Sequence, residues 1–119
     1  MTPENLIKAI KPLLPDTWEV AETKKHDFIE VVAYPPTLEG RHFPGEPSLW
    51  VSNRGVGWRT SNVWHVEVNH WDDVHEYEEA TWVATAEDAL EYVEQVLPTL
   101  LSIVDDLIKR QDALKGSTE

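Results

Sequence analysis

The sequence predicts an α+β fold, a two-layer sandwich in which an antiparallel sheet of four or five strands carries the N- and C-terminal helices on one face. Apolar residues recur with helical spacing at both ends of the chain. Between the two ends, apolar and polar residues alternate as they do in strands with one solvated side. The length of 119 residues suits a single domain, residues 1–119.

The helix boundaries follow from their capping residues. Thr2 followed by Pro3 is a typical helix start, because proline lacks the N–H that would be unsatisfied there. At the other end of the chain, Thr85 and Asp88 form a pair that resembles a capping box. The apolar stripe of this second helix continues to Ile108, and Gly116 is expected to stop it.

The C-terminal helix is long for a domain of this size. Residues 86–112 would span about 40 Å, against a domain diameter of about 35 Å. We therefore expect a bend at Pro98 or an overhang. An overhang would leave Leu107, Ile108 and Leu114 to pack against a second copy, so a homodimer through this helix is one possible assembly.

Alternation predicts five strands, over residues 17–23, 28–34, 48–54, a return strand that ends near Asn69, and 80–85. Residues 28–34 are apolar on both faces, which is typical of a central strand. Strand parity places Trp18 and Trp64 on the core side and Trp50 on the outer side. Three of the four connections between these strands are the proline-rich loop 35–48, a Gly55–Gly57 turn and a polar, acidic connection over 70–79.

The charge is spread unevenly. The chain has a formal net charge of −12, and no Lys or Arg occurs between Arg59 and Lys109. An acidic surface repels phosphate, so we expect no direct binding of nucleic acid or of an anionic membrane. A basic protein surface is the partner that this field attracts, although the charge could serve solubility alone.

No feature of the sequence indicates an enzyme or a cofactor. The chain has no Cys, which excludes a thiol nucleophile, a disulfide scaffold and Cys-ligated metals. No serine lies in a nucleophile-elbow context. No signal peptide is visible, and the longest uncharged apolar stretch is too short to span a membrane, so a cytoplasmic location is expected.

Three histidines, His65, His70 and His75, recur every five residues beside acidic residues. Imidazole and carboxylate are ligands for zinc or manganese. A spacing of five, however, points successive strand residues to opposite faces, which disfavours a shared metal. We therefore interpret them as polar residues of a strand end and a turn.

The candidate partner-binding surface combines the acids of the second half of the chain with a tryptophan as apolar anchor. The acids are Glu67, Asp72, Asp73, Glu76, Glu78, Glu79 and the helical Glu87, Glu91 and Glu94, and the anchor is Trp50 or Trp71.

The leading hypothesis is a small, acidic, non-enzymatic binding protein whose acids replace the phosphates that a basic partner surface normally holds. An inhibitor of a nucleic-acid-handling enzyme, encoded by a phage or mobile element, fits this pattern best. The alternative is a structural assembly subunit, such as a phage tail component. In layout and charge the chain resembles small phage inhibitors, bacterial immunity proteins and tail-assembly subunits, but fold alone does not determine function.

Overall fold

The structure is a computed structural model that describes residues 2–23, 28–35, 47–53, 63–71 and 76–117. Within these residues the chain forms two α-helices, one 3₁₀ turn and five strands. They are α1 (Pro3–Ile10), η1 (Lys11–Leu13), β1 (Glu19–Glu22), β2 (Glu30–Tyr34), β3 (Ser48–Ser52), β4 (Trp64–Trp71), β5 (Glu76–Val83) and α2 (Ala86–Ser117).

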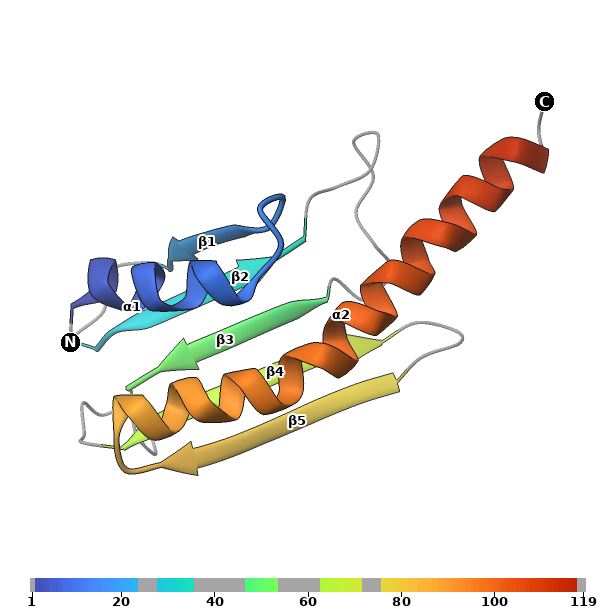
Figure 1. Cartoon of the computed structure of the whole chain (residues 1–119). Coiled ribbons are helices and arrows are strands. Elements are labelled where there is room, and N and C mark those ends of the chain that lie inside the picture. Colours follow the sequence, from blue (N-terminus) through green and yellow to red (C-terminus); the bar gives the residue numbers. More distant parts are fainter. Residues whose placement is uncertain (1, 24–27, 36–46, 54–62, 72–75, 118–119) are drawn as a thin grey trace.

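The five strands form one antiparallel sheet in the order β1-β2-β3-β4-β5, so each strand pairs with its neighbours in the chain. Both helices lie on the same face of this sheet (Figure 1). Helix α1 packs over β1 and β2, whereas α2 packs over β4 and β5. The predicted two-layer α+β sandwich is confirmed. Strand β2 is an interior strand, as predicted for residues 28–34, and β3 is the middle one.

Both helices begin where their capping residues predict. The Thr2 hydroxyl accepts a hydrogen bond from the backbone N–H of Asn5 (3.1 Å), and Pro3 is the first residue of α1. The Thr85 hydroxyl accepts one from the backbone N–H of Asp88 (3.1 Å) at the start of α2. These contacts satisfy N–H groups that have no partner inside the helix.

Helix α2 is longer than the sheet that it covers. Figure 1 shows the helix changing direction near its middle, and its C-terminal half runs beyond the strands. Pro98 lies in this helix, where it cannot donate the backbone hydrogen bond to Glu94. The helix continues to Ser117, so the predicted stop at Gly116 is wrong by one residue. A glycine near a helix end costs only about 1 kcal/mol, and helix ends vary by one or two residues.

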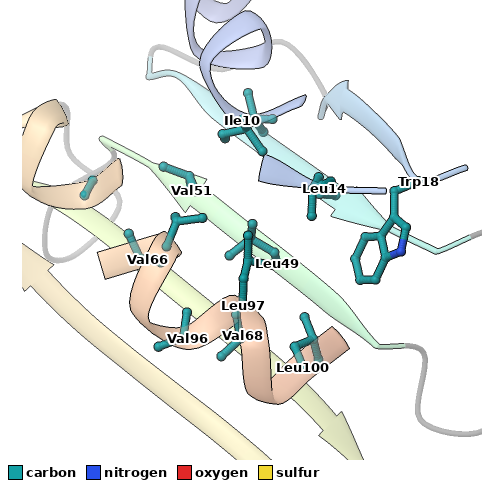
Figure 2. Packing of buried hydrophobic residues seen from close by; sticks show 14 of the residues in the cluster. Ile10, Leu14, Trp18, Leu49, Val51, Val66, Val68, Val96, Leu97 and Leu100 are labelled. Atoms are coloured by element: carbon teal, nitrogen blue, oxygen red, sulfur yellow. The ribbon is translucent and has the colours of Figure 1, made fainter. Parts of the chain in front are cut away.

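The core lies between the helices and the sheet, as Figure 2 shows for side chains of α1, β3, β4 and α2. Trp18 and Trp64 belong to it, as predicted. Leu107 is only 4% exposed within a single chain. Leu107, one of the three residues expected to pack against a second copy, is therefore already covered within one chain.

The hairpin formed by β4 and β5 is longer than predicted. Strand β4 continues to Trp71, and β5 already begins at Glu76, so most of the expected connection 70–79 is strand. Acidic residues on β5 conceal the alternation, because polar residues occur on both faces of this edge strand. The expected Gly55–Gly57 turn lies outside the described residues.

Candidate functional site

The face of the sheet that points away from the helices, which we call the outer face, combines aromatic residues with glutamates. Strand register and alternation assign its members, since cross-strand partners point to the same side. They are Glu19, Ala21, Glu30, Val32, Tyr34, Ser48, Trp50, Ser52, His65, Glu67, Asn69, Glu78, Ala80 and Trp82.

Among the side chains that the structure describes on the outer face, Trp82 is the most exposed large apolar one. Its side chain stacks on His65, with ring centroids 4.2 Å apart and ring planes 30° apart. Trp82 is 44% exposed, whereas His65 is 8% exposed. The tryptophan therefore covers the histidine and presents its remaining surface to solvent.

Hydrogen bonds fix two further aromatic rings on this face. Trp50 Nε1 donates to Ser48 Oγ (3.0 Å), and Ser48 Oγ donates to Asn69 Oδ1 (3.2 Å). Tyr34 Oη donates to Glu19 Oε2 (2.7 Å). This bond to the glutamate is the main reason that the pKa of Tyr34 is raised. Trp50 is half-buried, and Tyr34 is 37% exposed.

The charged side chains that the five strands contribute to the outer face are all negative in the described part of the chain. Among the residues whose side chains the structure describes, Glu19, Glu30, Glu67 and Glu78 contribute carboxylates from four different strands. None of the five strands contains a Lys or an Arg. Carboxylates beside exposed aromatic rings suit contact with a cationic, partly apolar surface.

Three of the predicted site residues lie together on this face. Trp50 and Glu67 are direct cross-strand partners on β3 and β4, and Glu78 lies on β5 opposite Asn69. Glu79, although adjacent to Glu78 in sequence, points to the helix side of the sheet. There it accepts a long hydrogen bond from Tyr92 Oη of α2 (3.5 Å).

The predicted helical acids are exposed on α2, in the other layer of the fold: Glu87, Glu91 and Glu94. Because the helix packs against the opposite side of the sheet, these acids and the outer face cannot contact one flat partner surface together. The acidic surface predicted from the sequence is thus divided between the sheet layer and the helix layer.

The remaining predicted residues lie at the β4–β5 hairpin end. Trp71 and Glu76 form the last cross-strand pair of the two strands. Asp72 and Asp73 lie outside the described residues.

The histidines are separated as strand parity predicts. His65 lies on the outer face, and His70 lies on the helix side, where it is 2% exposed. His75 lies outside the described residues. Among the residues that the structure describes, no cluster of His, Asp or Glu has the geometry to hold a metal ion.

Sequence reasoning missed two exposed aromatic residues, Tyr34 and Trp82. The parity of β2 places Tyr34 on the outer side, so this assignment was available from alternation. The stack of Trp82 on His65 was not available, because it depends on the register between β4 and β5.

Comparison with known protein families, with curated proteins and with solved structures gives no match to this chain. Within the described part of the chain, neither helix combines the length and apolar character needed to cross a membrane.

Proposed function

We propose that the protein is a small, acidic, non-enzymatic binding protein that uses the outer face to occupy a basic surface of a protein partner. One observation carries this proposal: an exposed tryptophan lies among carboxylates on a sheet face whose strands contain no Lys or Arg. Both helices pack on the opposite face of the sheet (Figure 1), and Trp82 on the outer face is 44% exposed.

The two kinds of side chain contribute differently to binding. Carboxylates at a contact steer a basic partner and raise the rate of association, and salt screens this effect over about 8 Å at physiological ionic strength. An indole that is desolvated in the complex slows dissociation, because burying it removes a large apolar area from water. We assign the slowing of dissociation to Trp82 and the steering of the partner to Glu67 and Glu78.

The partner class follows from the charge of the chain. Surfaces rich in Lys and Arg are found on proteins that hold nucleic acid, where they neutralise phosphate. A protein with a net charge of −12 competes for such a surface. We therefore propose an inhibitor of a nucleic-acid-handling protein, of the kind that a phage or mobile element encodes.

The test uses two charge reversals of equal size on the two layers. The partner is first captured from the native host with tagged protein and identified by mass spectrometry. Its association rate is then measured against salt for the wild type, for Glu67→Lys/Glu78→Lys on the outer face, and for Glu91→Lys/Glu94→Lys on α2. We expect the outer-face variant to associate more slowly and with a shallower salt dependence than the helix variant. Equal effects of the two variants would contradict a binding surface on the outer face.

One observation favours a second candidate, a structural assembly subunit. The molecule measures 53 × 24 × 23 Å, and the C-terminal half of α2 extends its long axis beyond the sheet. A protruding helix is a suitable element for head-to-tail or ring contacts. Light scattering at micromolar concentration separates the candidates, since self-assembly into rings favours the assembly subunit, whereas a salt-sensitive complex with a basic protein favours the inhibitor.

A further inference from the structure

Glu67 of β4 lies between two tryptophans of the outer face. Trp50 of β3 is its direct partner on one side, and Ala80 of β5 is its partner on the other. Trp82 follows Ala80 by two residues and is therefore a diagonal neighbour of Glu67, about 7–8 Å away. Because Ala80 is small, the space between the carboxylate and the Trp82 ring is not filled from β5.

The two indoles are held by contacts within the outer face. Trp50 Nε1 is hydrogen-bonded to Ser48 (3.0 Å), and Trp82 rests on His65 (centroids 4.2 Å apart). His65 covers part of the Trp82 ring, but the residue is still 44% exposed, so part of the indole surface is open to a ligand. Neither ring needs to be ordered by the ligand, which lowers the entropic cost of binding.

Glu67 supplies the charge of this arrangement. It is half-buried, and within the described part of the chain no hydrogen bond or ion pair engages its carboxylate. Partial burial weakens solvent screening, so a cation that reaches the carboxylate is bound more strongly than at a fully exposed site. A half-buried carboxylate next to an exposed ring face suits a cation that is also planar.

We infer that Glu67, Trp50 and Trp82 receive an arginine side chain from the basic surface of the partner. Its guanidinium stacks on the exposed side of Trp82 and donates paired hydrogen bonds to the Glu67 carboxylate. This inference rests on the proposed function and specifies the contact within it. Arginine is favoured over lysine because its planar group stacks on an indole and matches a carboxylate with two parallel N–H donors, whereas an ammonium is a compact, strongly hydrated charge.

Deca-arginine and deca-lysine peptides test the inference, because they carry the same charge and differ in the cationic group. Affinities are measured by calorimetry at low salt for the wild type and for Trp82→Leu and Glu67→Gln. The matched controls are Tyr34→Leu, which removes another exposed aromatic of the outer face, and Glu91→Gln, which removes one charge from the helix layer. All four substitutions are at half-buried or exposed positions, and circular dichroism confirms that each variant is folded.

We expect the wild type and both controls to bind deca-arginine about two- to fivefold more tightly than deca-lysine, the factor expected for one cation–π contact. Trp82→Leu and Glu67→Gln should abolish this preference. Equal affinity of the wild type for the two peptides, or a preference that survives both substitutions, overturns the arginine contact while leaving a charge-driven outer face intact. Failure of both peptides to bind at low salt overturns the proposed function as well.

Discussion

The indole of Trp82 stacks on the imidazole of His65, and this contact joins β4 to β5 on the side of the sheet without helices. The histidine below is buried while the tryptophan above is exposed. A surface aromatic in such a fixed position can stabilise the folded chain and also serve as an anchor for a partner. The two roles are separated by measuring stability and binding on the same variants.

Replacing Trp82 by Ala should lower the free energy of unfolding by about 1 kcal/mol, because the stack on His65 is lost. Tyr34→Phe is a control that removes only the exposed hydrogen bond to Glu19, and it should change stability by less than Trp82→Ala. Urea denaturation gives both values. A Trp82→Ala protein as stable as the wild type would show that the stack contributes nothing to folding.

The contact between α2 and the sheet depends on fully buried leucines. Leu100 is inaccessible to solvent and packs in the main core cluster, so Leu100→Ala should lower the free energy of unfolding by about 2–5 kcal/mol. Ser102, on the exposed side of the same helix, is the control, and Ser102→Ala should stay within about 0.5 kcal/mol of the wild type. Similar urea midpoints for the two variants would contradict the packing of α2 on the sheet.

The start of α2 depends on the Thr85 hydroxyl. Thr85→Ala leaves the Asp88 backbone N–H without its acceptor and should cost about 1 kcal/mol. Thr85→Asp keeps an oxygen acceptor and places a negative charge at the helix N-terminus, so it should restore stability. Thermal unfolding of both variants checks this, and a Thr85→Ala protein with wild-type melting temperature would be inconsistent with the cap.

Stability should fall in alkaline solution. The pKa of Tyr77 is raised in the folded chain, mainly by burial, with a smaller contribution from Glu79 and an opposing hydrogen bond from Thr99. The folded state therefore holds the proton to a higher pH than the unfolded state, for which the pKa is about 10. The stabilisation that Tyr77 contributes is therefore complete below the pKa of the unfolded state. It is lost as the pH rises through the pKa that Tyr77 has in the folded chain.

Urea denaturation between about pH 9 and pH 11 measures the alkaline loss. Tyr77→Phe should make the decline shallower without abolishing it, because the pKa values of Tyr34 and Tyr92 are also raised. Parallel curves for the variant and the wild type would mean that Tyr77 is not one of the groups responsible.

The fold could be predicted because its determinants are local. The Thr2 and Thr85 caps act within three residues, and Leu49 and Val51 alternate with Trp50 along β3. The prediction failed where the local pattern is ambiguous. The acidic residues at the start of β5 were predicted to lie in a loop. Glutamate occurs both in edge strands and in turns, so these residues do not distinguish the two.

The site could be predicted only in part, because its assembly is not local. Glu78 and Glu79 are neighbours in sequence, yet one lies on the outer face and the other contacts Tyr92 on the helix side. The position of Trp82 above His65 depends on cross-strand register, which turn geometry and core packing set together. Composition predicted acids beside a tryptophan, but it could not specify which acids share a face.

Amide chemical-shift mapping with deca-arginine tests the central claim most directly, because it reports the non-proline backbone positions of both layers in one experiment. If the outer face binds basic partners, the largest shifts will fall on β3, β4 and β5 and on the indole N–H groups of Trp50 and Trp82, while exposed α2 positions shift little. Shifts that are largest around Glu87, Glu91 and Glu94, or that are equal on both layers, would contradict the account.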